Sequence, residues 1–235
     1  ARAGTSGRYG ERLLVVTANA RSFLLSMCGL RRNTEPIASG TLPGCNGLDE
    51  ACGAHTGNYL HEILGKADGQ VDFSQFDNDG PDGISNSGDD DGYVDFVAFI
   101  MPEVGGECGT SNLWAHRYVL EGWSPGVGFT TNDPAAGGGN IRVSDYIIQS
   151  GLGGNTGCTG GQIMPIGTMA HESGHAFGLP DLYDTFGISE GTGEWSLMGS
   201  GSWNVQSAPA HMDGWSKFTL GWIAVDTMTG GASPR

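Results

Sequence analysis

The chain has few positive charges. Of its 235 residues, 11 are Lys or Arg and 26 are Asp or Glu, which gives a formal net charge of −15. Nucleic acids select basic surfaces, because phosphate contacts supply much of the binding free energy. The composition therefore argues against nucleic acid as a partner.

Long apolar runs are also lacking. The most hydrophobic early stretch, residues 13–30, is interrupted by Arg21 and by polar side chains. No run approaches the roughly 20 apolar residues that span a bilayer, so we expect no membrane span. Glycine is abundant instead, with 42 residues, more than twice the usual share of roughly 7%. We therefore expect one domain that is rich in loops and long enough to bury a core.

The five cysteines do not form any CxxC pair, which argues against a thiol redox centre or a second zinc site. In an oxidising compartment an odd number leaves one thiol over. Cys45 and Cys52, close together in a Gly-rich loop, are the first expected pair, and Cys108 with Cys158 is the second. The chain starts with Ala rather than Met, so we expect a mature or excised segment of a secreted protein.

Residues 171–181 read HESGHAFGLPD and carry the strongest chemical signal. His171 and His175 lie four residues apart, so on a helix they share one face and can bind one metal ion. Gly178 suits the left-handed conformation that ends a helix, and Asp181 follows the turn. Catalytic zinc usually takes three protein ligands and keeps a fourth position for water. The spacing therefore predicts a Zn²⁺ site formed by His171, His175 and Asp181.

Glu172 lies between the two histidines, where its carboxylate can reach the metal-bound water. That water has its pKa lowered to roughly 7, so Glu172 can act as the general base in peptide hydrolysis. One alternative is a thermolysin-like zinc hydrolase with Glu194 as the third ligand. Glycines flank Glu194 and discourage the helix that this geometry needs. Tyr183 and His211 are candidates for a second oxyanion donor.

The pattern HExxHxxGxxD resembles the immune inhibitor A-like secreted zinc metalloproteases, a metzincin-like group. The resemblance extends from about residue 71 to residue 222 and is most specific over 171–203. It implies a methionine turn beneath the metal, and Met198 in WSLMGSGSW fits this turn. Ser173 stands where the family has a bulky apolar residue, which affects helix packing rather than the ligands.

The resemblance implies an α+β fold: a metzincin-like zinc peptidase catalytic domain with a twisted mixed sheet, an active-site helix and a Met-turn. We expect residues 1–235 to form a single catalytic domain. It comprises an N-terminal part (1–70) with the first strand and helix, a metalloprotease core (71–222) and a linker or truncated end (223–235).

Hydrophobic periodicity predicts the regular elements. The active-site helix begins near Pro165, with Ile166 and Phe177 among its core-facing residues. An edge strand of such folds aligns the substrate backbone by strand addition, and 141–150 and 111–120 are both candidates. The expected strands are 11–18, 91–101 and 141–150, and a further helix is expected over 55–67.

Residues 77–95 form a strongly acidic segment in which seven of nineteen residues are Asp. Carboxylates crowded together repel one another unless a hard cation neutralises them. The pattern is typical of EF-hand loops without the closing Glu, and the immune inhibitor A-like enzymes are similar in having an acidic loop of this kind. We expect it to bind Ca²⁺ through Asp77, Asp79, Asp82, Asp89, Asp91 and Asp95.

The leading hypothesis is a secreted, monomeric zinc endopeptidase that acts on proteins or peptides and is stabilised by calcium. A catalytically idle metal-binding adhesion module is an alternative, although such a module has no need of a general base at Glu172. A zinc hydrolase that acts on something other than peptides is a third possibility, because the same ligands activate water for any carbonyl.

Overall fold

A four-stranded mixed sheet forms the centre of the fold in the computed structural model. The structure describes residues 13–17, 53–110, 112–123, 125–153, 158 and 161–226. The strand order is β1-β2-β6-β3, with β1, β2 and β6 parallel and β3 antiparallel to β6. The mixed sheet expected from the sequence is therefore confirmed. The strands are β1 (Leu13–Thr17), β2 (Phe96–Val104), β6 (Asp145–Leu152) and β3 (His116–Val119).

A second, antiparallel sheet consists of β4 (Phe129–Pro134) and β5 (Asn140–Val143). The strand predicted over 141–150 is thus wrong as a single element, because it divides at Ser144 between β5 and β6. Ser144 donates its hydroxyl to Glu121 and accepts from the backbone of Leu120. These bonds interrupt the ladder, so the chain passes from one sheet to the other.

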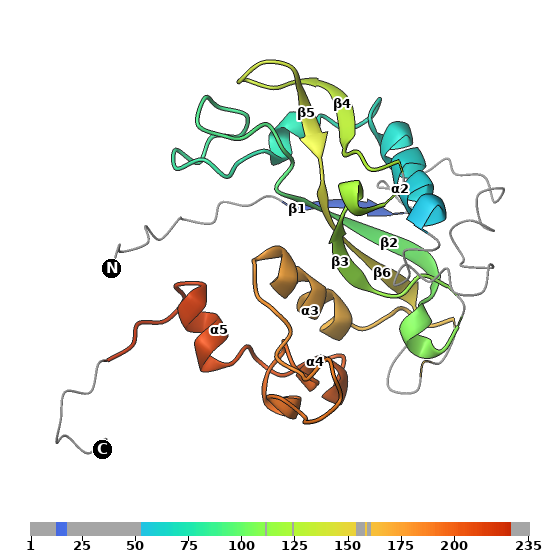
Figure 1. Cartoon of the computed structure of the whole chain (residues 1–235), viewed down its shortest axis with the longest axis vertical. Helices are drawn as coiled ribbons and strands as arrows, with labels where there is room; N and C mark the ends of the chain where they lie inside the picture. Colours follow the sequence, from blue (N-terminus) through green and yellow to red (C-terminus); the bar gives the residue numbers. More distant parts are fainter. Residues whose placement is uncertain are drawn as a thin grey trace.

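Helices cover both faces of the main sheet (Figure 1). Helix α2 (Gly53–Ala67) lies on one side with the small sheet, and α3 (Ile166–Ala176) lies on the other with α4 (Gly201–Asn204) and α5 (Gly214–Thr219). The short 3₁₀ turns are η4 (Phe73–Phe76), η5 (Gly106–Cys108), η6 (Leu120–Gly122) and η7 (Gly193–Trp195).

Strand β2 shows why the sheet has two covered faces. Val97 and Phe99 belong to the large cluster that includes α2, whereas Phe96 and Ala98 belong to a smaller cluster beside α3. Successive side chains of a strand point to opposite faces, and here both faces are apolar and buried. This is the pattern of a strand in the middle of a layered fold.

Several sequence expectations need correction. Strand β2 begins at Phe96 rather than at residue 91, because Asp91 to Asp95 belong to the acidic loop. Ile166 is 57% exposed at the first turn of α3, so its predicted core position is wrong. Of the two edge-strand candidates, 111–120 contains β3, which lies at an edge of the main sheet, whereas the β6 part of 141–150 is interior.

Cys108 and Cys158 form a disulfide, as predicted. The other predicted pair, Cys45 with Cys52, lies outside the described residues, as does Cys28. Within the part of the chain that the structure describes, no helix is both long enough and apolar enough to cross a bilayer.

Candidate metal centre

Helix α3 carries the two histidines and ends where the sequence predicts. Pro165 directly precedes the first residue of the helix. Proline suits the start of a helix, because an N–H there would have no partner within the helix. At the other end Gly178 adopts the left-handed conformation, with φ of 84°. The amides of Gly178 and Leu179 donate to the carbonyls of His175 and Gly174. This turn ends the helix and returns the chain toward the histidines.

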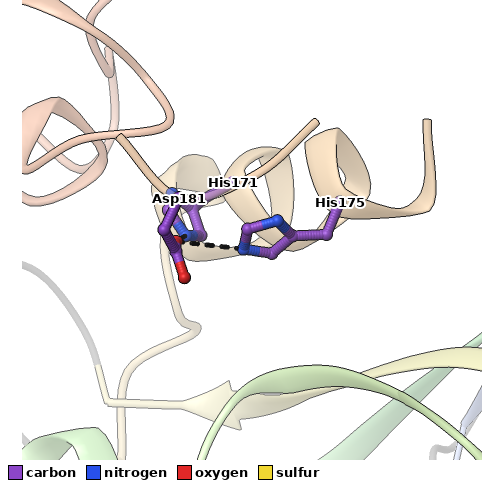
Figure 2. A group of neighbouring side chains, drawn as sticks. All are labelled: His171, His175 and Asp181. Carbon is purple, nitrogen blue, oxygen red and sulfur yellow. Dashed lines mark hydrogen bonds and ion pairs between the residues drawn. The ribbon is translucent and has the colours of Figure 1, made fainter. Parts of the chain in front are cut away.

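His171, His175 and Asp181 converge as expected (Figure 2). Asp181 Oδ1 lies 3.1 Å from His171 Nε2 and 3.2 Å from His175 Nε2. One ligand atom from each residue lies within 4.8 Å of the other two. His171 is buried, and the other two residues are partly buried. The three side chains are therefore placed to share one cation.

The backbone fixes the state of both imidazoles. His171 Nδ1 lies 2.8 Å from the carbonyl oxygen of Leu197, and His175 Nδ1 lies 2.7 Å from that of Leu179. A carbonyl can only accept, so each Nδ1 must carry the proton. In the neutral imidazole, Nε2 then presents a lone pair toward the Asp181 carboxylate. Three electron-rich atoms that face one another form a donor set that needs a cation between them.

The electrostatics of the three residues agree with this requirement. Burial disfavours the charged form of His175, but hydrogen bonds with Asp181 and Leu179 outweigh it and raise the pKa of His175. Burial also works against the Asp181 carboxylate, yet the two histidines hold the pKa of that carboxyl well below its usual range. The site favours an added positive charge, which a proton or a metal ion can supply.

Glu172 faces the same cleft as the histidines. Its side chain is buried, and this burial, only partly offset by the two histidines, raises the pKa of Glu172 to about 6. A carboxyl with this pKa is still largely ionised at neutral pH but accepts a proton more readily than an exposed one. These are the properties of a general base.

Met198 packs against helix α3 at Gly174, which lies between the two histidines in the sequence. It is fully buried, and a Cβ added at Gly174 would come within 2.3 Å of the Met198 sulfur. The Met198 carbonyl accepts from the amide of Leu182, next to Asp181. The preceding carbonyl, that of Leu197, accepts from His171. One short segment therefore supports the ligand helix and the Asp181 loop together.

A cleft of about 770 Å³ is lined by the three converging side chains. The start of the edge strand β3 and the residues before it also line this cleft, as do Gly199, Ser200, Ser202 and Trp203 after Met198. Tyr183 lines the cleft and stacks on His171 at 6.2 Å between ring centroids. The other candidate oxyanion donor, His211, is exposed and does not line this cleft. Glu194 is also exposed and lies outside the ligand group, so the thermolysin-like alternative lacks support.

A buried chain of hydrogen bonds stands behind the edge strand. The indole N–H of Trp123 donates to the Tyr146 hydroxyl at 2.6 Å, and that hydroxyl lies 2.8 Å from His116 Nε2. His116 Nδ1 donates to the Trp114 carbonyl at 2.7 Å. Burial lowers the pKa of His116 to about 4 despite this bond, so the imidazole is neutral and accepts from Tyr146. This series of hydrogen bonds fixes β3 at the cleft.

The acidic segment brings together three of its six candidate ligands: Asp77, Asp79 and Asp91. Asp77 is 1% exposed, and its Oδ1 is buried and has no hydrogen-bond partner among the residues that the structure describes. Burial and the neighbouring carboxylates, Asp90 first among them, raise the pKa of Asp77 to about 7. A buried, unpaired carboxylate oxygen beside two more carboxylates suits a hard cation.

The remaining three candidates are not part of this group. Asp82 accepts from the amide of Ile84, Asp89 accepts from the amide of Asp82, and Asp95 accepts from the amide of Asn78. These side chains brace the loop's own backbone. Sequence spacing alone does not separate them from the three that converge.

Other cleft residues carry no sequence signal that we recognised. Glu107, Trp114 and Thr168 line the cleft. Thr168 lies one helical turn before Glu172, so the periodicity of α3 could have identified it. Glu107 lies 65 residues before Glu172 in the sequence, and only the folded chain brings it to the cleft.

Comparison with known proteins agrees with this geometry. The family model of the immune inhibitor A peptidase M6 catalytic domain matches residues 44–230. The chain is 32% identical over 149 residues to the pre-pro-metalloprotease PrtV of Vibrio cholerae serotype O1. It is 33% identical over 138 residues to immune inhibitor A of Bacillus thuringiensis subsp. alesti. These alignments cover 57% and 56% of this chain, but only 15% and 18% of those relatives.

Proposed function

Because the chain belongs to the immune inhibitor A (M6) peptidase family, and so is a metallopeptidase catalytic domain, we propose that it is a secreted zinc-dependent endopeptidase stabilised by calcium. The observation that carries the proposal is the convergence of His171, His175 and Asp181 beside Glu172 in one cleft. A binding module would gain nothing from a buried carboxylate at that position.

The donor set fits zinc. Two neutral imidazoles and one carboxylate form a mixed N and O ligand set of the kind found in catalytic zinc sites. The carbonyls of Leu197 and Leu179 orient both rings, and such outer partners are typical of metal-ligating histidines. A bound zinc ion lowers the pKa of water to roughly 7 and polarises the substrate carbonyl.

Glu172 then accepts the proton of the attacking water and passes it to the leaving amine. Its raised pKa supports both transfers, because the protonated form is reached at little cost near neutral pH. Tyr183, at the mouth of the site, is the proposed second donor to the developing oxyanion. The peptide backbone runs along β3, whose free edge offers amides and carbonyls for strand addition.

Met198 is the proposed Met-turn residue. Its buried thioether fills the space that Gly174 leaves beneath the histidines, so the ligand helix rests on a fixed apolar base. Substrates in this proposal are proteins or peptides, and the domain acts as a monomer outside the cell. The Cys108–Cys158 disulfide supports an extracellular location, because such bonds persist in oxidising compartments.

Calcium is proposed to bind Asp77, Asp79 and Asp91. The unpaired, buried Oδ1 of Asp77 supports this choice. The loop leads directly into β2 at the centre of the sheet. Calcium would therefore neutralise the loop and stabilise the fold that carries the active site. It would take no part in the chemistry itself.

The test compares three substitutions, with metal content measured by mass spectrometry and cleavage measured on casein. Glu172→Gln is expected to keep zinc and to lose activity by roughly 10²–10⁴-fold, the usual contribution of a general base. Asp181→Ala is expected to lose zinc. Glu194→Gln serves as the control and is expected to keep both zinc and activity.

Two results would contradict the proposal. Undiminished cleavage by Glu172→Gln would exclude Glu172 as the general base. Zinc retained in Asp181→Ala but lost in Glu194→Gln replaces the proposed third ligand with the thermolysin-like one.

A further inference from the structure

Glu107 is a carboxylate in the cleft that the hydrolytic machinery does not use. It lies in η5, just before the edge strand, and lines the same cavity as His171 and Glu172. A carboxylate with a purely structural role has no need to line this cleft. Glu121, for example, does not line it. The place of Glu107 in the cleft instead puts its carboxylate where a bound peptide can contact it.

The position of Glu107 is fixed from several directions. Its Oε1 accepts from the Ser150 hydroxyl at 2.6 Å, and its Oε2 accepts from the Ala115 amide at 3.1 Å. The carboxylate folds back over Gly105, where an added Cβ would come within 2.2 Å of Glu107 Oε2. The next residue, Cys108, is bonded to Cys158. Gly105 thus leaves room for the carboxylate, and the two hydrogen bonds and the neighbouring disulfide restrict its position.

Both bonds leave acceptor capacity on the carboxylate, because each oxygen has a second lone pair. A buried hydroxyl adds a further unused group. Thr168 is 5% exposed, lines the same cleft, and its Oγ1 has no hydrogen-bond partner among the described residues. The cleft therefore holds polar groups that a substrate side chain can satisfy.

The balance of charge around the cleft is negative. Asp181 and Glu172 together offset the two positive charges of a bound zinc ion, so Glu107 remains as an extra negative charge. Arg117 is the one Arg or Lys among the residues lining this cleft, and its guanidinium is paired with Asp145. The net charge of −15 also attracts cationic peptides to the protein as a whole.

We propose that Glu107 is a specificity-determining residue that selects a Lys or Arg side chain of the substrate near the scissile bond. The proposal rests on the proposed peptidase function. The ammonium or guanidinium group binds the free lone pairs of Glu107, and Thr168 accepts a further hydrogen bond. The aliphatic stem of the substrate side chain packs on Trp114, whose partly exposed indole lines the same wall.

The test uses the zinc-loaded protein and a set of quenched fluorescent peptides. A single Lys is moved through each position on both sides of the cleaved bond, and each Lys peptide is paired with one that carries norleucine instead. Norleucine keeps the length of the stem and removes the charge. At one position we expect kcat/KM to be roughly tenfold higher for Lys, the scale of a charge-assisted hydrogen bond. An Arg peptide tests whether a planar group binds equally well.

Glu107→Gln is expected to bring the Lys to norleucine ratio close to one. A purely structural role would instead lower kcat/KM for both peptides together and leave their ratio unchanged. Glu121→Gln is the matched control. Glu121 also accepts from a serine hydroxyl at 2.6 Å, but it lines a different cavity, so this variant is expected to keep the ratio.

The outcomes are distinct. Cleavage without a Lys preference at any position, or a preference that survives in Glu107→Gln, overturns the role of Glu107 and leaves the peptidase function intact. If the wild-type protein cleaves none of the peptides, the proposed function fails as well. The Lys to norleucine ratios of the wild-type protein are measured without any variant. A missing Lys preference would therefore be detected even if Glu107→Gln does not fold.

Discussion

Replacing Gly174 by Ala tests the packing between helix α3 and Met198. In an exposed helix interior, Ala is favoured over Gly by about 1 kcal/mol. At Gly174 the new Cβ would lie 2.3 Å from the Met198 sulfur and 3.1 Å from its terminal carbon. Met198 is fully buried, and overpacking against a buried side chain costs about 1–3 kcal/mol.

The substitution is therefore expected to destabilise the domain by up to about 2 kcal/mol and to lower Tm by a few degrees. Gly65 provides the control in α2, because a Cβ there would meet only Phe129, at 3.9 Å. Gly65→Ala should be stabilising, so the two substitutions differ in sign. Urea denaturation at a fixed free zinc concentration measures both, since metal binding shifts apparent stability.

Combining Gly174→Ala with Met198→Ala separates the clash from other effects. Met198→Ala alone opens a cavity that costs about 2–5 kcal/mol. In the double variant the methyl group introduced at position 174 occupies part of that cavity, so the two costs should not add, and we expect a coupling of about 1–3 kcal/mol. Additive costs, or a Gly174→Ala variant as stable as Gly65→Ala, would refute the proposed contact.

Two further predictions concern the acidic loop and the last helix. Calcium should raise Tm relative to a chelator in the wild-type protein, and Asp77→Asn should remove most of that rise; a calcium-dependent Tm that persists in this variant excludes Asp77 as a ligand. Asp213 caps α5 by accepting from the amides of Trp215 and Ser216. Its pKa is lowered from 3.8 to about 2, because hydrogen bonds, led by that of the Ser216 hydroxyl, outweigh its burial. Its contribution to stability is therefore complete above pH 3.8 and is lost as the pH falls toward 2. Asp213→Asn should flatten the pH dependence of unfolding in this window, and Asp213→Ala should cost about 1 kcal/mol at pH 7; an unchanged pH profile in Asp213→Asn would count against the cap.

The convergence of His171, His175 and Asp181 could be predicted because its geometry is local. His171 and His175 share a face by helical periodicity alone. Gly178 ends the helix through a conformation that glycine favours. The resulting turn brings Asp181, three residues later, back toward the histidines. The first strand and α2 were equally accessible from their apolar patterns. Short-range rules are sufficient for all of these features.

Features that depend on distant partners could not be predicted. Ser144 divides a continuous alternating pattern because Glu121 and Leu120 bind it from another part of the chain. Ile166 is exposed because the first turn of α3 extends beyond the layer that it was expected to face. Among the aspartates, only the folded loop separates the three that converge from those that bind backbone amides. Periodicity does not contain this information.

The link between Cys108 and Cys158 spans 50 residues and encloses the strands from β3 to β6. Closing a loop of that length removes denatured-state entropy worth about 4 kcal/mol in the chain-entropy model. Helix α3 lies outside this covalent ring, whereas β3, the strand proposed to bind the substrate, lies inside it. A reductant should therefore loosen β3 before it disturbs the proposed metal ligands, so the proposed peptide selectivity should decline earlier than metal retention.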